Sequence, residues 1–159
     1  MKVPPYFKAT TDLISTIAKK VQNNLGNCFT KPIYADALER ELAANGVQYE
    51  RGVPLAIFYP GSNIPLGHKH RVDFIVDGKV LVLVKAAEET GKAEEFNIVT
   101  MLQASKKSFA LLVQFKKENV YVSKFVRYTK FANSINRSDE YEPPSESGVF
   151  MQEAEAIYA

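Results

Sequence analysis

The chain has 159 residues, of which 46% are hydrophobic and 24% charged, with eight glycines and eight prolines. These values are typical of one globular domain around a single core, and they exclude a disordered polymer or a repeat array. No apolar run approaches the ~20 residues that span a membrane, so we expect no membrane partner. The first residues lack the apolar core of a signal peptide, and Cys28 is the one cysteine. We therefore expect an intracellular protein, or a component of an intracellularly assembled particle.

The formal charge of +2 is the sum of two unlike parts. Residues 137–159 carry six acids against one base, which leaves 19 bases and 12 acids in residues 1–136. The body is therefore near +7 and the tail near −5. Such a body attracts polyanions, while an acidic tail shields the body or docks on a neighbour.

Two helices are predicted in the first part of the chain. Apolar residues recur at helical spacing up to Leu25, with possible caps at residues 10–12 and a stop at Gly26. The second helix is predicted to begin near Pro32, because proline is tolerated in a first turn, and to end at residues 45–46.

The middle of the chain is predicted to form a sheet interrupted by a third helix. Strand patterns cover residues 47–59, 71–76 and 79–86, a helix fits 92–105, and two further strands fit 109–115 and 120–128. The run 80–84 is apolar on both faces, as in a central strand that is covered on both sides. This order predicts an α/β (α+β) fold in which helices flank a mixed sheet.

The C-terminal part differs from this body. We expect one domain over residues 1–131, then an acidic linker and a tail over 132–159. The tail has an apolar stripe that is typical of a short amphipathic helix, formed by Phe150, Met151, Ala154, Ile157 and Tyr158. We predict that this helix docks on its own body or on a neighbouring subunit, giving a homo-oligomer or a larger assembly. A frayed end is the alternative.

The segment 71–86 carries the most informative polar residues. Its apolar strand ends in Lys85, and a lysine at that place needs a partner because an unpaired buried ammonium is costly. Asp73 is the candidate partner if the turn at Asp77-Gly78 puts the two residues on one face. A three-residue loop does so and a two-residue loop does not, and Asp-Gly is compatible with both.

Residues ~18 to 127 resemble the GxxExxY family, a branch of the PD-(D/E)xK nuclease superfamily. The matching residues are Leu25-Gly26, Phe29, Tyr34, Ala37-Leu38, Glu41-Leu42, Gly46-Val47, Val53-Pro54-Leu55, Asp73 to Val80, Lys85-Ala86, Leu111-Leu112 and Phe115. The resemblance implies a four-stranded mixed sheet flanked by helices. It also implies a site where an aspartate and a glutamate bind Mg²⁺ and a lysine assists hydrolysis.

The chain departs from that pattern where the chemistry is expected. Asp73 and Lys85 match the motif aspartate and lysine, but Leu83 stands in place of the motif glutamate. Lys31 replaces the glutamate of the GxxExxY motif, and Asn97 replaces a glutamine on the following helix. Because Mg²⁺ requires hard oxygen ligands, we expect no catalytic residues, no metal and no cofactor, Mg²⁺ being expected only in an active nuclease.

These replacements suggest a polar cluster in the place of a metal site. We hypothesise that the Lys31 ammonium neutralises Asp73 beside Lys85. The alternative is that Lys31 points into solvent at the helix start. Glu88 and Glu89, or more weakly Glu41 and Glu94, are candidates for a relocated acid, although solvated residues are the simpler interpretation.

The later strands and the turns beside them mix bases with aromatic residues. Their candidate nucleic-acid contacts are Lys106, Lys107, Lys116, Lys117, Lys124, Arg127 and Lys130. A half-buried edge strand shows the same pattern. His68 and His70 share a strand face, but no third metal ligand stands near them, so surface histidines are expected there.

Three functions remain open. The first is a catalytically inactive nuclease-fold protein used as a structural and assembly module. The second is a protein that binds DNA or RNA without cutting it, through the ancestral basic groove. The third is an active nuclease with relocated acids. The residues at positions 31 and 83 argue against the third, and the loss of both acids favours the first.

Overall fold

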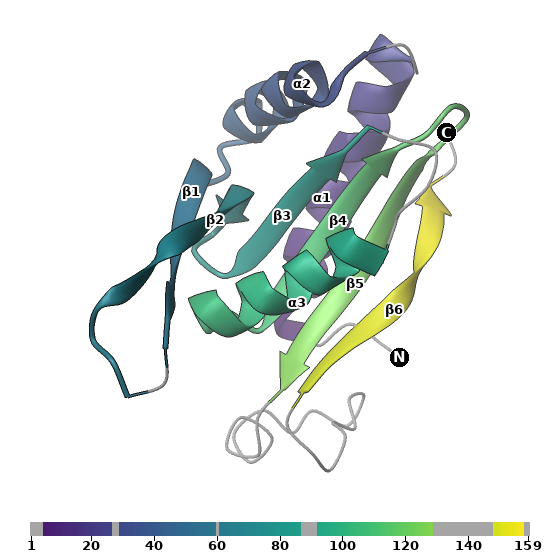
Figure 1. Ribbon diagram of the computed structural model, residues 1–159. Helices are drawn as coiled ribbons and strands as arrows, with labels where there is room; N and C mark the ends of the chain where they lie inside the picture. The colour runs from purple at the N-terminus through teal and green to yellow at the C-terminus, as the bar shows by residue number, and fades with distance from the viewer. Residues whose placement is uncertain (1–4, 27–28, 60, 87–91, 129–147, 158–159) are drawn as a thin grey trace.

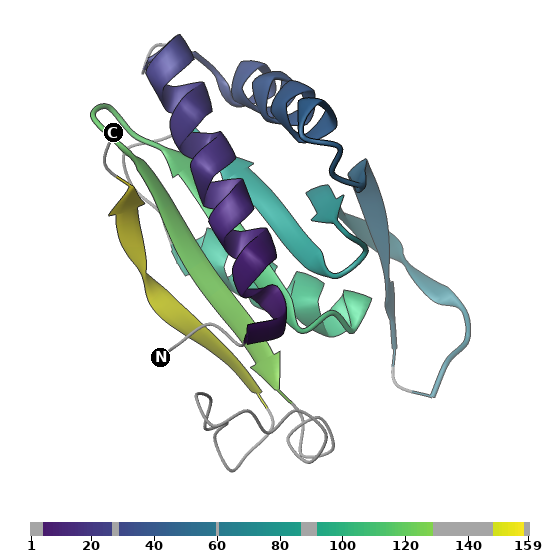
Figure 2. The same ribbon diagram turned by 180° about the vertical axis from the view of Figure 1, so that it is seen from behind.

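A six-stranded mixed sheet with helices on both faces makes up the molecule (Figures 1 and 2). The computed structural model describes residues 5–26, 29–59, 61–86, 92–128 and 148–157, with the backbone alone for 92–96, 128 and 148–157. Its elements are α1 (Pro5–Leu25), α2 (Lys31–Ala44), β1 (Tyr49–Phe58), β2 (Pro65–Val76), β3 (Val80–Lys85), α3 (Lys92–Ser105), β4 (Phe109–Phe115), β5 (Val120–Tyr128) and β6 (Gly148–Ile157). This confirms the predicted α+β class, in which helices flank a mixed sheet.

The strands follow one another across the sheet in chain order. Every neighbouring pair is antiparallel except β3 and β4, which are parallel and are joined through α3. A parallel pair needs such a crossover, because its second strand must begin at the same end of the sheet as its first. α3 therefore covers one face, while α1 and α2 cover the other (Figures 1 and 2).

Two hydrophobic clusters hold these layers together. One cluster lies between the sheet and the α1 and α2 helices, with Ile14, Tyr34 and Leu38 facing alternate strand residues such as Val82. The second lies under α3, where Ile98 and Leu102 pack with strand residues of the opposite face, Leu81 and Leu112 among them. The predicted double coverage of residues 80–84 is confirmed.

The start of α1 differs from the prediction. The helix begins at Pro5, so residues 10–12 lie inside it and do not cap it. Phe7 explains the extra turns, because its buried ring stacks on Phe109 of β4 with the ring centroids 5.0 Å apart. The Thr11 hydroxyl donates to the Phe7 carbonyl at 2.8 Å, which satisfies that buried group within the helix.

The predicted amphipathic helix at the C-terminus is wrong. Residues 148–157 form β6, which pairs antiparallel with β5 from Tyr128–Gly148 to Val120–Ile157. A segment this short is a marginal helix, whereas the open edge of β5 supplies a partner for its backbone hydrogen-bonding groups. Phe150 and Met151 pair with Val126 and Phe125, and Ile157 with Val120. Tyr158 and the predicted linker up to residue 147 lie outside the described residues, as does Cys28.

Within the described residues, no helix is long and apolar enough to cross a membrane.

Tyr34 links α1, α2 and β4, and this link is open to measurement. Its buried ring stacks on Phe115 at 4.2 Å between centroids, and its hydroxyl donates to the Gly26 carbonyl at 2.6 Å. We expect Tyr34→Phe to cost about 1 kcal/mol of unfolding free energy, through the lost hydrogen bond. Tyr34→Ala is expected to cost about 3–5 kcal/mol, because it also leaves a cavity. Urea denaturation measures both. The control is Tyr6→Phe at a tyrosine that is 68% exposed, and an equal loss there would contradict the assignment.

Candidate functional site

The turn between β2 and β3 decides which residues share a face of the sheet. The ladder runs from Val76–Val80 to Phe74–Val82, so Asp77, Gly78 and Lys79 form a three-residue loop. Asp77 and Gly78 both have positive φ, 53° and 66°, which asparagine, aspartate and glycine adopt most readily. The ladder ends at Phe74–Val82, and this is the register that, continued by one residue pair, would place Asp73, Leu83 and Lys85 on one face. The three-residue alternative is therefore the correct one.

Asp73 lies where β2 leaves β3, and both of its carboxylate oxygens have partners. Oδ2 accepts a hydrogen bond from the Val84 N–H at 2.8 Å. Oδ1 lies 3.0 Å from the Lys31 Nζ, in an ion pair where the Asp73 side chain is 18% exposed and the Lys31 side chain 50%. Lys31 is the first residue of α2, so this one carboxylate joins two strands and a helix.

The structure therefore brings Lys31 and Asp73 together, as the polar-cluster hypothesis expected, and Lys31 does not simply point into solvent. Leu83 packs against the hydrophobic cluster under α3. Lys85 is half-buried and pairs in register with Gln114 of β4, a buried amide. Asn97 is exposed on α3.

The Val84 N–H is a site component that sequence reasoning missed. It is a backbone donor, so no residue type marks it, and only the register of β2 against β3 brings it to Asp73. Sequence reasoning also missed Arg51 of β1, whose guanidinium reaches Asp36 at 2.6 Å and Glu39 at 3.0 Å on α2. The hydrogen bond to Asp36 raises the pKa of Arg51, against the lowering effect of burial and with support from Glu39. This contact fixes α2 to β1.

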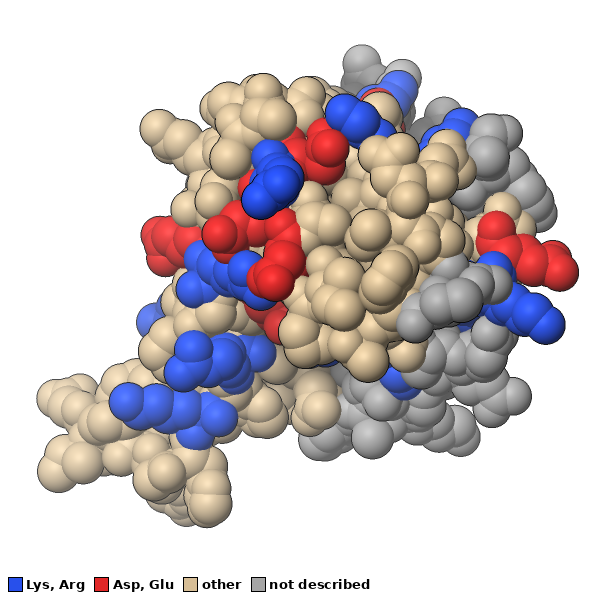
Figure 3. Space-filling view, turned by 90° about the horizontal axis from the view of Figure 1, so that it is seen from above, with Lys and Arg blue, Asp and Glu red and all other residues tan. Residues whose placement is uncertain are grey.

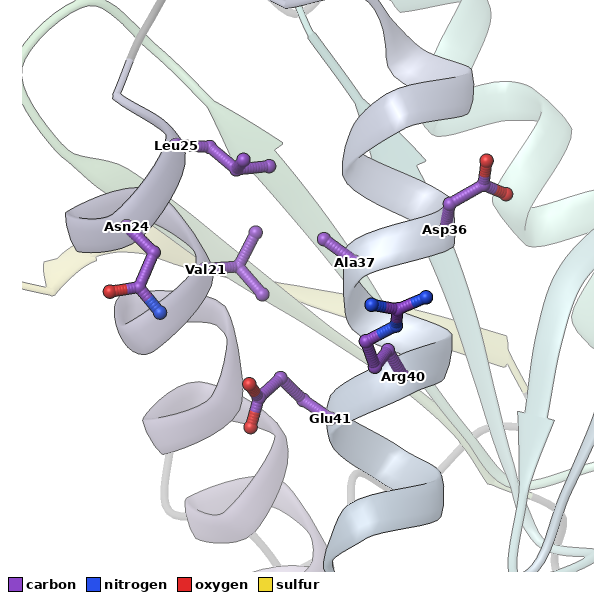
Figure 4. A pocket seen from close by; sticks show the side chains of 7 residues that line it. All are labelled: Val21, Asn24, Leu25, Asp36, Ala37, Arg40 and Glu41. Atoms are coloured by element: carbon purple, nitrogen blue, oxygen red, sulfur yellow. The ribbon is translucent and has the colours of Figure 1, made fainter.

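The candidates for a relocated acid do not gather around Asp73. Glu41 of α2 points toward α1 and lies 3.0 Å from the Lys20 Nζ, on a cavity of about 290 Å³ between the two helices (Figure 4). Glu88 and Glu89 lie outside the described residues, and the Glu94 side chain does as well. In the part of the chain that the structure describes, no three His, Cys, Asp or Glu side chains form a group that could hold a metal ion.

The predicted nucleic-acid contacts are divided between two ends of the sheet. Lys106 and Lys107 precede β4, whereas Lys116 and Lys117 follow it, and seven strand residues extend about 20 Å. Arg127 donates to the carbonyls of Lys106 and Lys107, so it belongs to the first group. Lys107 also has a contact of its own, and two further candidates lie outside both groups. The Lys107 Nζ donates to the Gly78 carbonyl at 2.6 Å, Lys124 lies within β5, and Lys130 is outside the described residues.

Seen from above, the end of the molecule that includes α2 shows acidic and basic side chains intermingled (Figure 3). This face is a network of ion pairs, to which Asp36, Glu39 and Glu41 contribute. It is not a continuous basic surface.

The two contacts of Asp73 are expected to contribute differently to the free energy of unfolding, and substitutions measure each contribution. We expect Asp73→Ala to cost about 1–3 kcal/mol of unfolding free energy, since it leaves the Val84 N–H without an acceptor. Asp73→Asn keeps an acceptor and is expected to cost less. Lys31→Gln is expected to cost no more than about 1 kcal/mol, because the half-exposed lysine is screened by solvent. Urea denaturation gives the order, and a Lys31→Gln loss as large as that of Asp73→Ala would contradict it.

Comparison with known proteins places this arrangement in a family. A sequence model of the PD-(D/E)XK nuclease superfamily matches residues 8–127, which is most of the chain and extends from α1 to the end of β5. No curated protein and no solved structure matches the chain. The matched residues include Asp73, Lys85 and most of α1, α2 and α3. The chain belongs to the PD-(D/E)XK nuclease superfamily.

Proposed function

We propose that this chain is a catalytically inactive member of the superfamily, of the GxxExxY type, that serves as a structural protein and assembles with copies of itself. The observation that carries the proposal is the Asp73 carboxylate, one oxygen of which is paired with an ammonium group and the other with a backbone N–H. A nuclease of this superfamily is expected to present that carboxylate to a metal ion.

The residues around Asp73 do not fit Mg²⁺. This ion takes oxygen ligands in octahedral geometry, and in proteins it is held by one or two carboxylates together with phosphate and water. Here the neighbour on β3 is Leu83, which has no ligand atom, and the neighbour on α2 is a cation. A divalent ion at Asp73 would have to displace Lys31 and remain beside its charge, so Asp73 and its neighbours are a poor site for Mg²⁺.

Assembly is supported by the position of β6. This strand is at the edge of the sheet, and 19 residues, 129–147, connect it to β5, although antiparallel neighbours need only a short turn. Fully extended, that length of chain reaches about 60 Å. The edge of β5 on a second copy has the same backbone donors and acceptors, so β6 can pair there with an identical ladder. We propose that exchange of β6 joins subunits.

Binding of nucleic acid through the ancestral groove remains a prediction. The candidate cations divide into groups at opposite ends of β4, and Arg127 and Lys107 donate to carbonyl groups. No observation favours this function over assembly.

Restoring the lost carboxylates tests the inactive site. We expect Lys31→Glu combined with Leu83→Glu to bind Mn²⁺ in titration calorimetry, because it places two carboxylates beside Asp73. The matched control is Lys31→Gln with Leu83→Gln, which changes size and polarity similarly but adds no charge. We expect no binding by this control or by the natural chain, and thermal denaturation verifies that each variant is folded.

Two outcomes of this titration would contradict the proposal. If the folded double glutamate variant bound no Mn²⁺, positions 31 and 83 would not correspond to the lost ligands. If the natural chain bound Mn²⁺ and Asp73→Asn abolished the binding, the site would be functional.

Crosslinking between single-cysteine chains tests strand exchange. Lys124 and Gln152 are register partners on β5 and β6. We expect an oxidised mixture of a Lys124→Cys chain and a Gln152→Cys chain, both carrying Cys28→Ser, to give a covalent dimer on a non-reducing gel. A dimer that forms in the mixture, and that neither chain forms when oxidised alone, requires β6 of one copy to lie on β5 of another. A mixture with Lys117→Cys in place of Lys124→Cys is the control, because Lys117 precedes β5.

A disulfide found only within the chain that carries both Lys124→Cys and Gln152→Cys would show that β6 stays on its own body. Exchange of β6 would then be excluded as the means of assembly.

A further inference from the structure

The β1–β2 hairpin extends beyond the body of the molecule as an arm (Figures 1 and 2). β2 pairs with β3 only over residues 74–76, but it pairs with β1 as far as Phe58–Pro65. We define the arm as residues 56–71, of which the structure describes all but residue 60. A two-stranded ribbon is marginally stable in water by itself, so this outer part gains from an external surface.

Large apolar side chains gather at the end of the arm and remain exposed. They are Phe58, Tyr59, Ile64 and Leu66, which are 51%, 68%, 77% and 46% exposed and are called the apolar tip here. The large hydrophobic side chains that are exposed elsewhere in the described residues are Tyr6, Phe29 and Ile33. An exposed apolar cluster on a projecting element is typical of a contact site.

The turn of the arm satisfies part of its own backbone. The Ser62 N–H donates to the Tyr59 carbonyl at 2.9 Å, and the Ile64 N–H donates to the Ser62 hydroxyl at 3.1 Å. Backbone groups that are paired internally lose less when water is removed from around them. The turn is therefore suited to an apolar environment as well as to water.

The charge of the arm has one sign. Residues 56–71 contain no Asp or Glu, and the bases Lys69 and Arg71 stand with His68 and His70 on the β2 side. Lys69 is three residues from Leu66 of the apolar tip, which is about 10 Å along a strand. In Figure 3 the projection has a tan end, with blue side chains behind it and no red among them. The arm thus has an apolar end, and behind it two bases, Lys69 and Arg71, which are called the basic collar here.

We propose that the arm docks on an anionic phospholipid surface, with the apolar tip inserted and the basic collar at the lipid phosphates. Interfacial segments insert about 5–10 Å into the boundary between head groups and acyl chains, which agrees with the spacing of tip and collar. Juxtamembrane bases are attracted to anionic lipids. The expectation of no membrane partner rested on the lack of a membrane-spanning segment. A surface contact of this kind needs no such segment, so the proposal departs from that expectation.

A nucleic-acid duplex fits the arm less well. A duplex takes up an apolar side chain by inserting it as a wedge between two base pairs. The other side chains of a four-residue tip would then lie against charged phosphates. Tight duplex binding uses about 6–10 phosphate contacts, whereas the arm has two full positive charges. A lipid surface takes up the whole tip and needs few cations.

Cosedimentation of the full chain with vesicles tests the proposal. We expect binding to phosphatidylcholine vesicles that contain about a third phosphatidylserine, and weaker binding to phosphatidylcholine alone. Tyr59→Ser with Ile64→Ser is expected to lower the partition coefficient about tenfold or more. Lys69→Ser is expected to lower it about fivefold, with less effect at high salt. Both variants change exposed side chains, and thermal denaturation verifies their fold.

Tyr6→Ser is the matched control, because Tyr6 has the same 68% exposure as Tyr59 but lies on α1. We expect its partition coefficient to equal that of the natural chain. The proposal is overturned if the natural chain stays in solution with anionic vesicles, or if the Tyr59 and Ile64 double variant sediments with them equally well. A gel shift of a DNA duplex that the double variant loses, while its vesicle binding persists, would assign the arm to nucleic acid instead.

Discussion

The Asp73 carboxylate is the contact on which the arrangement of this protein depends. It lies mostly out of solvent, where a carboxylate needs partners for both oxygens. One partner is a backbone N–H of β3 and the other is the ammonium at the start of α2. The β2–β3 ladder ends at the adjacent pair, Phe74–Val82, so Asp73 lies between this ladder and the arm. The site, the entry into α2 and the hairpin are consequently linked through one side chain.

In the proposed inactive site, an ammonium group stands where the superfamily is expected to hold a metal ion. An ammonium on a flexible stem neutralises a carboxylate and holds strand and helix together, but it offers no open coordination position for a phosphate or a water. Leu83 adds apolar contact under α3, at the position where the family resemblance implies a glutamate ligand. The body consequently gains positive charge relative to the family pattern, and part of its near +7 balance follows from these two positions.

Contacts with other molecules are proposed at the two opposite edges of the sheet. On one side β6 adds a strand that a second copy can supply equally well, and on the other the arm extends past the core with an apolar end. The interior strands β3 and β4, covered on both faces, keep these two sides in a fixed relation. In the proposed function, these covered strands serve as the rigid centre between the two contacts.

The sequence by itself determined the class of fold and most elements. The third helix and the strands at 109–115 and 120–128 have the predicted bounds, because hydrophobic periodicity follows directly from burial on one face or two. The family resemblance marked Asp73 and Lys85 as motif positions and Leu83 as a departure from the motif, and these assignments stay predictions. Tertiary structure alone decided the loop length at Asp77-Gly78, the pairing of Lys31 with Asp73, and the strand at 148–157. Each of these depends on a partner that is distant in sequence, either a register or an open strand edge, and local spacing carries no information about such partners.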